Sequence, residues 1–246
     1  MTDPAPATAV AVPPIVAGRW GIGLFALVLG PGLVLMQLGG LLGRRFGGVD
    51  RPWLPYAAAI PGFLLFWVVG WRGVSLFDDR GPRALGLQPR PLSALLHGVY
   101  YYVSLGLVWW LALFVYTAVL SLLDIPLPEQ TAVRAFAASR DDWVGTAALA
   151  LAVVVAAPLG EEMLFRGVAH GWARRRLPWL PTALIVGSIF GLLHVESSAA
   201  IVFAPPLALL GVMLAWVREK PCGLLGCVAF HATHNAVTLA ITLSRV

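Results

Sequence analysis

The residues best suited to chemistry are two adjacent carboxylates, Glu161 and Glu162, which follow a long run of uncharged residues. An acid inside a membrane helix costs about 2.5–3.5 kcal/mol on insertion scales, so a pair needs compensation or a function. Helical geometry supplies part of that compensation, because Glu162 and Arg166 lie on one face and can form an ion pair. Glu161 is rotated from Glu162 by about 100°. We therefore expect Glu162 to be paired with Arg166 and Glu161 to be free for chemistry.

Two histidines repeat this anomaly, because His194 and His231 also lie in apolar segments. At 1.5 Å per residue, Glu161, His194 and His231 lie about 20, 18 and 17 Å along their segments from the ends that carry Arg and Lys. Three unrelated packing roles would not predict this agreement in depth, so the sequence predicts that the side chains converge inside the membrane. The alternative for Glu161 is a position at the membrane interface, beside the cluster that begins at Arg174.

The residue types at these positions are typical of hydrolysis. A carboxylate withdrawn from water binds a proton more readily than an exposed one and can act as a general base near neutral pH. Imidazoles can orient a water, donate to a developing oxyanion or ligate a metal. His231 and Asn235 share a helix face, so both can point at one carbonyl oxygen. These residues predict a water-activating site for an amide bond, to which His234 would contribute as a supporting or helix-contact residue.

The helices that must hold these residues are predicted to lie in lipid. Hydrophobic residues make up 59% of the 246-residue chain and charged residues 12%, against roughly 45–50% and ~25% in soluble domains. So much apolar surface cannot be hidden in an interior of this size. Unpaired backbone groups are too costly in lipid, and the alternating pattern of a barrel is absent. The sequence predicts an all-α polytopic membrane helix bundle with its active site in the bilayer and about seven transmembrane segments, near 20–42, 53–71, 92–123, 143–170, 182–198, 199–217 and 222–243.

Three regions are expected along the chain. Residues 1–19 lack the features of a cleaved secretory signal and are predicted to be a disordered N-terminal tail. Residues 20–142 would form three N-terminal transmembrane helices, and residues 143–246 the catalytic transmembrane core. The two cysteines, Cys222 and Cys227, lie in one apolar segment and are expected to serve packing rather than metal or redox chemistry.

The net charge of +5 is attributed to topology rather than to nucleic acid, because no basic face with interleaved aromatic residues occurs outside the loops. With the amino terminus inside, the cytoplasmic loops carry more Arg and Lys than the outer loops. We therefore expect a multi-pass protein of the plasma or inner membrane, with a cytoplasmic N-terminus, that contacts the lipid bilayer and no nucleic acid.

Three ordered motifs in residues 143–240 resemble those of the CPBP intramembrane proteases. This family includes bacterial relatives of the type II CAAX prenyl endopeptidase and bacteriocin-immunity (Abi) membrane proteins. The resemblance implies an endopeptidase that cleaves a membrane-anchored protein or peptide. It also implies a role for each motif, with Glu161 and His194 activating water, His231 and Asn235 forming the oxyanion site, and Glu162 and Arg166 holding the helix. The motifs are Glu161-Glu162-x-x-x-Arg166, Phe190-x-x-x-His194 and His231-x-x-x-Asn235.

Metal use and function class leave alternatives open. Glu161, His194 and His231 could together hold zinc, but the His-Glu-x-x-His signature of zinc proteases is absent. A glutamate-based mechanism that requires no cofactor is therefore favoured over a zinc enzyme. A non-catalytic immunity or scaffold protein that keeps the motifs for stability is the first alternative. A proton-linked transporter with the same polar residues along a relay is the second.

Overall fold

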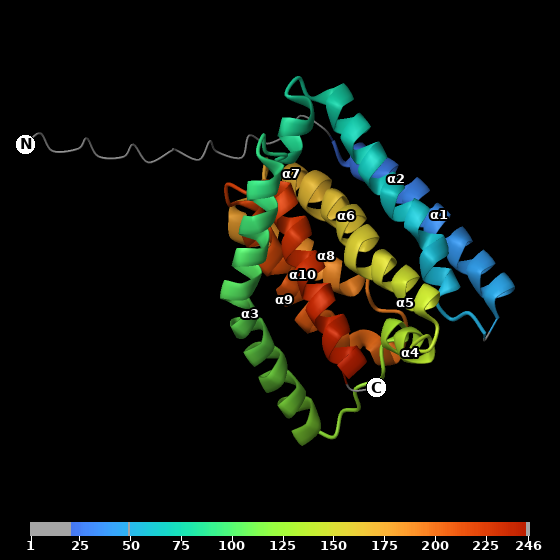
Figure 1. Cartoon of the computed structure of the whole chain (residues 1–246). Helices are drawn as coiled ribbons and strands as arrows, with labels where there is room; N and C mark the ends of the chain where they lie inside the picture. The colour runs from blue at the N-terminus through green and yellow to red at the C-terminus, as the bar shows by residue number, and fades with distance from the viewer. Residues whose placement is uncertain (1–20, 49, 245–246) are drawn as a thin grey trace, which may run out of the picture.

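The computed structural model describes residues 21–48 and 50–244 of the chain, and this part contains helices and loops without a strand. The all-α prediction is therefore confirmed, while the prediction for residues 1–19 lies outside the described residues. Figure 1 shows long helices that pack side by side, with shorter helices between them. The α-helices are α1 (Ile22–Gly47), α2 (Leu54–Phe77), α3 (Pro91–Leu122), α4 (Thr131–Ala138), α5 (Trp143–Ala150), α6 (Ala157–Glu162), α7 (His170–Ala173), α8 (Trp179–Leu192), α9 (Ala204–Arg218) and α10 (Gly223–Ser244).

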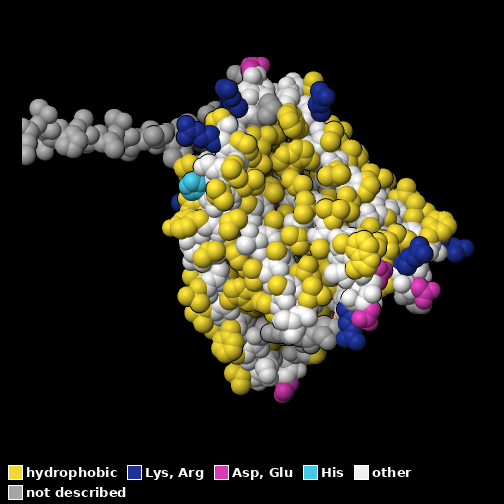
Figure 2. Space-filling model, viewed as in Figure 1, with side chains coloured by type: hydrophobic (Ala, Val, Ile, Leu, Met, Phe, Trp, Pro, Cys, Tyr) yellow, Lys and Arg dark blue, Asp and Glu magenta, His cyan; other side chains and the backbone are white. Residues whose placement is uncertain are grey.

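Burial is inverted relative to a water-soluble protein. Large apolar side chains are exposed along the helices, as at Leu107 and Leu122, whereas the side chains of Glu162 and Arg166 are fully buried. Figure 2 shows hydrophobic side chains over most of the visible face, with charged side chains gathered toward its margins. An apolar surface of this extent is stable only against lipid. The chain is therefore a multi-pass membrane protein.

Six helical stretches in the described ranges are long and apolar enough to cross a membrane, which agrees approximately with the expected seven. The remaining predicted segment is α8, which is apolar but has only 14 residues. At 1.5 Å per residue α8 is about 21 Å long, less than the ~30 Å of the hydrocarbon core. The six are Gly23–Gly47, Leu54–Phe77, Pro91–Leu122, Trp143–Ala173, Ser198–Arg218 and Gly223–Ser244.

The predicted segment 182–198 ends too late, because α8 stops at Leu192 and His194 lies in the turn that follows. In a continuing α-helix the Phe190 carbonyl would accept the backbone N–H of His194. Instead that N–H donates to the Gly191 carbonyl at 3.3 Å, and the His194 ring bonds the Phe190 carbonyl at 2.7 Å. The His194 side chain thus occupies the Phe190 carbonyl in place of a backbone N–H, and the chain can leave the helix at this point.

The fourth transmembrane stretch, Trp143–Ala173, is interrupted by two π-helical sections, Leu151–Ala156 and Met163–Ala169. Pro158 follows the first section and lacks the backbone N–H that a helix interior needs. Helices with π turns often carry functional residues, because the wider turn changes the direction of the side chains that follow. The acidic pair sits on α6, between the two sections.

Helix α10 lies at the centre of the bundle and contacts α3, α6 and α9, and α8 pairs with α9 (Figure 1). Residues 124–142, between two of the predicted transmembrane segments, contain a short helix, α4, which the hydropathy pattern did not reveal. Thr131 at the start of α4 donates a hydrogen bond to Glu196, and the Tyr116 hydroxyl donates to the Val202 carbonyl at 2.7 Å. These bonds hold α4 and α3 against the α8–α9 connection.

Candidate active site

The ion pair expected on the fourth transmembrane stretch is present. Arg166 Nη1 lies 3.1 Å from Glu162 Oε1, and both side chains are fully buried. The same guanidinium donates through Nη2 to the Gly211 carbonyl of α9 at 3.0 Å and lies 4.6 Å from the centre of the Phe190 ring of α8. Arg166 therefore joins its own helix to two others. These contacts offset part of the cost of burying the two charges, while Arg166 Nε and Glu162 Oε2 have no hydrogen-bond partner.

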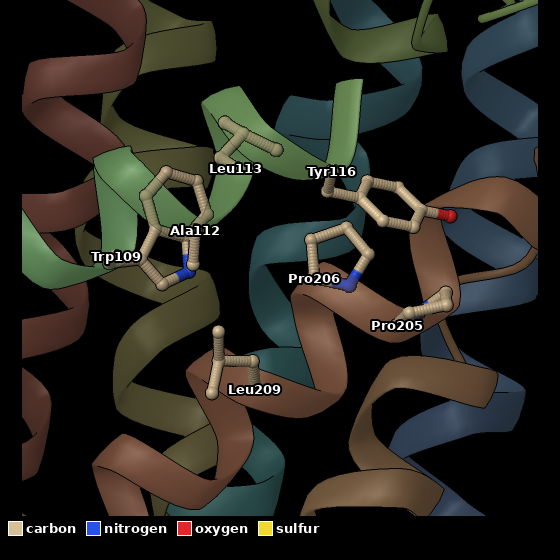
Figure 3. A pocket seen from close by; sticks show the side chains of 7 residues that line it. All are labelled: Trp109, Ala112, Leu113, Tyr116, Pro205, Pro206 and Leu209. Carbon is tan, nitrogen blue, oxygen red and sulfur yellow. The ribbon is translucent and has the colours of Figure 1, made fainter. Parts of the chain in front are cut away.

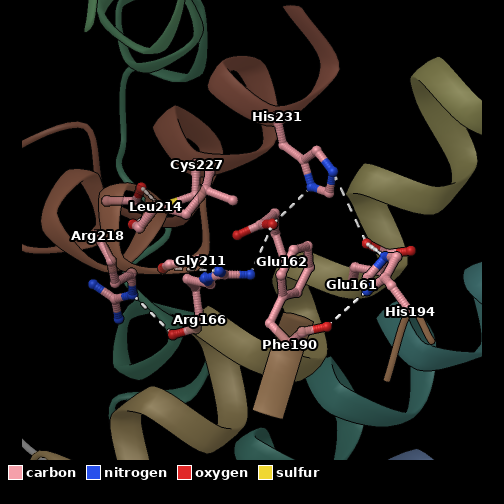
Figure 4. Close-up of polar contacts among 11 residues, drawn as sticks. Glu161, Glu162, Arg166, Phe190, His194, Gly211, Leu214, Arg218, Cys227 and His231 are labelled. Carbon is pink, nitrogen blue, oxygen red and sulfur yellow. Dashed lines mark hydrogen bonds and ion pairs between the residues drawn. The ribbon is translucent and has the colours of Figure 1, made fainter. Parts of the chain in front are cut away.

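Glu161 points away from this pair toward two imidazoles (Figure 4). Its Oε2 atom lies 3.7 Å from His194 Nε2 and 4.0 Å from His231 Nε2. This oxygen is buried and has no hydrogen-bond partner. A buried carboxylate oxygen without a direct partner costs free energy unless a small molecule such as water bridges it to its neighbours. The three side chains from three segments thus enclose one small polar space.

The neighbours of each imidazole determine which ring nitrogen faces Glu161. His194 Nδ1 lies 2.7 Å from the Phe190 carbonyl, which can only accept, so Nδ1 carries a proton. His231 Nδ1 lies 2.9 Å from Glu162 Oε1, so the ionised Glu162 likewise requires a proton on that nitrogen. In their neutral forms both rings therefore direct an unprotonated Nε2 at Glu161. Two imidazole acceptors and one carboxylate acceptor converge, which suits a molecule that donates protons.

Asn235 does not point into this space. Its amide nitrogen donates to the carbonyl of Val153, in the first π-helical section, at 2.8 Å. The expected shared face with His231 is present, because both side chains reach the fourth transmembrane stretch from α10. They contact it at different places, however, since His231 reaches the acidic pair.

His234 of α10 lies against α3. Its ring is surrounded by three aromatic rings of α3, whose centres lie 4.4 Å (Trp109), 5.9 Å (Tyr102) and 6.3 Å (Trp110) away. This arrangement agrees with the expected helix-contact role. An apolar pocket of about 200 Å³ between α3 and α9 shares Trp109 with this cluster and contains none of the candidate site residues (Figure 3).

Sequence reasoning missed a second polar cluster at the Arg-rich end of the same helices. Glu219 accepts hydrogen bonds from His170 Nε2 and Arg174 Nε, each at 2.8 Å. The spacing of Glu162, Arg166 and His170 at successive intervals of four residues could have revealed His170 as part of one polar stripe. Burial of Glu219 opposes its ionisation, but the hydrogen bonds from His170 and Arg174 prevail and lower its pKa to about 2.

Arg218 is the last residue of α9, a position where a basic side chain usually reaches the membrane surface, yet the structure buries it. Its Nε donates to the Arg166 carbonyl and its Nη2 to the Leu85 carbonyl, both at 3.0 Å. Arg218 thus holds the backbone of the second π-helical section from the α9 side. No sequence signal distinguishes it from a loop arginine, because it is the last residue of its helix.

The residues that could hold a metal are the three expected ones. In a tetrahedral zinc site with bonds near 2.0–2.1 Å, the ligand atoms lie about 3.3 Å apart. Here the Nε2 atoms of His194 and His231 lie 3.7 and 4.0 Å from Glu161 Oε2, so the side chains would have to close by several tenths of an ångström. In the part of the chain that the structure describes, no group of His, Cys, Asp and Glu has the arrangement of a metal site. Cys222 and Cys227 are free and buried.

Comparison with known proteins places the site in a family context. The chain shows no detectable similarity to a curated protein or to a solved structure. A family model described as type II CAAX prenyl endopeptidase Rce1-like matches residues 143–237. The matched region contains Glu161, His194 and His231, and the family description supports a membrane endopeptidase. The resemblance to the CPBP and CAAX proteases is therefore confirmed over residues 143–237, which are similar to the Rce1-like type II CAAX prenyl endopeptidases.

Proposed function

We propose that this protein is an intramembrane endopeptidase that hydrolyses a peptide bond of a membrane-anchored protein or peptide, with a water activated by Glu161. The observation that carries the proposal is the convergence of Glu161 with two imidazole Nε2 atoms at 3.7 and 4.0 Å, in a part of the molecule flanked by apolar helices. General bases act through direct or water-mediated hydrogen bonds. The carboxylate and the two imidazoles could therefore close around one bridging water with small movements of their side chains.

In the proposed reaction the water donates one hydrogen bond to Glu161 and one to His194 Nε2. Glu161 removes a proton as the water oxygen bonds to the carbonyl carbon of the substrate. The same proton then passes to the departing amine nitrogen as the carbon–nitrogen bond breaks. The products are a carboxylic acid, which keeps the second proton of the water, and an amine, and Glu161 is again ionised.

His231 would stabilise the oxyanion of the tetrahedral intermediate. For this role His231 would carry a second proton, on Nε2, the nitrogen that is an acceptor in the neutral ring. Glu162 accepts from His231 Nδ1 at 2.9 Å, as the orienting carboxylate does in a catalytic triad. Asn235 was the other expected donor. One of its amide hydrogens is directed at Val153, so the proposal assigns the oxyanion to His231.

The direct test replaces Glu161 with glutamine, which keeps the shape of the side chain and removes the base. Loss of a general base reduces rates by about 10²–10⁴-fold. We expect Glu161→Gln to lose cleavage by at least about 10²-fold in a proteomic comparison of membrane peptides from cells with either form. Glu129→Gln, at an exposed loop position, is the matched control and should cleave normally.

Other outcomes of this comparison would support other functions. Unchanged peptide profiles, together with equal biological activity of wild type and His194→Ala, would indicate a non-catalytic immunity or scaffold protein. Proton-coupled flux in proteoliposomes without proteolysis would indicate a transporter. Cleavage that is lost with a zinc chelator and restored by zinc would assign Glu161, His194 and His231 as ligands. The glutamate mechanism predicts cleavage that a chelator leaves unchanged.

A further inference from the structure

The hydrogen bond from Asn235 to Val153 connects residues far apart in the sequence. Asn235 lies on the central helix α10, and Val153 lies in the first π-helical section of the stretch that carries Glu161. The Asn235 amide nitrogen lies 2.8 Å from the Val153 carbonyl oxygen. A side-chain amide that donates to a backbone carbonyl inside another helix is unusual, because helix carbonyls are normally occupied by their own backbone.

The local sequence explains why the Val153 carbonyl is available. In the π-helical section the N–H of Ala157 donates to the carbonyl of Ala152, five residues earlier. In the same register the next donor would be residue 158, and its acceptor would be Val153. Residue 158 is proline and has no N–H to donate. Asn235 therefore supplies the hydrogen bond that Pro158 cannot make.

We infer that Asn235 is a positioning residue that holds the proline-interrupted helix in the shape that directs Glu161 at the imidazoles. Pro158 lies one turn before Glu161, so a movement of this π-helical section would rotate or shift the carboxylate. The second tie between the helices is the His231–Glu162 hydrogen bond at 2.9 Å. Asn235 and His231 thus fix the stretch on both sides of Pro158. The inference rests on the proposed function, since it gives Asn235 its part in placing the proposed base.

A role as oxyanion donor makes a different prediction from a positioning role. An oxyanion donor acts on the substrate, so its removal costs the same factor whatever residue occupies position 158. A positioning residue that replaces the missing N–H of Pro158 becomes dispensable once that N–H is restored. Pro158→Ala restores the N–H and leaves the proposed catalytic groups in place. The two roles are therefore separated by a double-mutant cycle.

The experiment compares wild type, Asn235→Ala, Pro158→Ala and the double variant in membranes. In the wild-type background we expect Asn235→Ala to reduce cleavage by about 10–100-fold, the usual cost of losing a group that supports the reacting residues. In the Pro158→Ala background we expect the same change to cost no more than about twofold. Equal losses in both backgrounds, near the ~10²–10³-fold of an oxyanion donor, would overturn the inference.

Thermal unfolding of the same four purified proteins supplies a readout that does not depend on activity. Asn235→Ala should lower Tm in the wild-type background by about 2–4 °C, the shift expected for one lost hydrogen bond in a chain of this size. In the Pro158→Ala background, Asn235→Ala should have little effect on Tm. Thr233→Val is the matched control on α10, because Thr233 donates to its own helix at Ala229, and its Tm shift should be the same in both backgrounds.

The two readouts keep failure of the inference distinct from failure of the proposed function. Cleavage cannot be compared if the wild-type protein cleaves no peptide or if Pro158→Ala alone abolishes cleavage. In either case the Tm values of the four proteins still decide whether Asn235 compensates for the missing N–H of Pro158. Additive Tm shifts would overturn the inference even if Glu161→Gln proves that the protein is a protease. Coupled Tm shifts with additive losses of cleavage would show a structural bond that does not position Glu161, and would overturn it as well.

Discussion

At the residue scale, Glu161 and Glu162 are neighbours in sequence but have different environments. Glu162 is fully buried and accepts from Arg166 at 3.1 Å and from His231 at 2.9 Å. Glu161 Oε2 faces the two imidazoles and, like Glu162 Oε2, has no direct hydrogen-bond partner. The difference follows from the rotation of about 100° between successive residues of a helix. One carboxylate can therefore stabilise the bundle while the next remains available to substrate.

This difference predicts opposite consequences for the same substitution at the two positions. Glu162→Gln leaves the buried Arg166 guanidinium without a counter-charge, and breaking a buried pair in this way costs about 3–5 kcal/mol. We expect a large loss of resistance to denaturant in detergent, measured by the decay of helical circular dichroism. Glu161→Gln should leave that resistance nearly unchanged. Comparable losses at both positions would contradict the division of roles.

Much of the site could be predicted at this scale, because residue type and spacing are sufficient to find charged side chains in apolar helices. The pairing of Glu162 with Arg166 and the convergence of Glu161, His194 and His231 both follow from such spacing. The partner of Asn235 could not be predicted, since it depends on which backbone carbonyl of another helix lacks a donor. Helical periodicity specifies the face of a side chain and not the atom that it meets.

At the element scale, the close approach of α6 to α2 positions the acidic pair. Gly160 lies directly before Glu161, and a Cβ atom there would lie 2.6 Å from the Phe63 carbonyl oxygen and 2.9 Å from Phe63 Cα of α2. Both contacts are with backbone, which cannot swing aside as a flexible side chain can. The absence of a side chain at position 160 is therefore required for this helix contact.

Gly160→Ala should force α6 away from α2 and displace Glu161. Overpacking of this kind costs about 1–3 kcal/mol, so we expect a lower Tm together with reduced cleavage. Gly30→Ala in α1 is the matched control, because a Cβ atom there would meet nothing within 4 Å. An unchanged Tm and unchanged cleavage for Gly160→Ala would indicate that the two helices are not in close contact.

The cluster around Glu219 fastens the end of α9 to the end of the α5–α7 stretch. The pKa of Glu219 is about 2, below its ordinary value of 4.5, because hydrogen bonds from His170 and Arg174 outweigh the effect of burial. A lowered folded-state pKa adds stability above the unfolded value, and this stability is lost as pH falls through the folded value. The stabilising contribution should therefore be complete above about pH 4.5 and disappear toward pH 2.

Glu219→Gln removes this dependence. Between pH 4.5 and pH 2 the Tm of the wild-type protein in detergent should fall more steeply than that of the variant, and the two curves should approach each other at the acidic end. The difference in Tm between them at neutral pH measures how much the ionised Glu219 stabilises the protein. A constant gap over the whole range would show that ionisation of Glu219 contributes nothing to stability.

At the scale of the whole molecule, the exposed charges of the described residues are gathered toward the two ends of an apolar bundle (Figure 2). Figure 1 shows that the α2–α3, α7–α8 and α9–α10 connections lie at one end, with the start of α1. Arginines and lysines are more numerous at this end, and Lys220 stacks on Trp216 with its nitrogen 3.8 Å from the ring centre. Basic side chains and tryptophans of this kind are typical of a membrane interface, and basic loops remain cytoplasmic. We propose that this end, with the N-terminus, faces the cytoplasm.

The proposed orientation predicts which introduced cysteines a membrane-impermeant maleimide can reach in intact cells. Arg83→Cys is exposed at the basic end and should be protected, whereas Asp141→Cys is exposed at the opposite end and should be labelled. The native Cys222 and Cys227 are buried, so the wild-type protein is the unlabelled control. Labelling of residue 83 and not of residue 141 would show that the basic end faces the outside of the cell.

The sequence by itself determined that the protein is an all-helical membrane bundle, because composition and segment length dictate which structures can survive in lipid. It also predicted three polar motifs at a common depth, since rise per residue converts sequence distance into length. Only the tertiary structure decided that α8 stops before His194, that Arg218 is buried, and that Asn235 reaches Val153 beside Pro158. These features depend on hydrogen bonds between distant segments, which local periodicity does not encode.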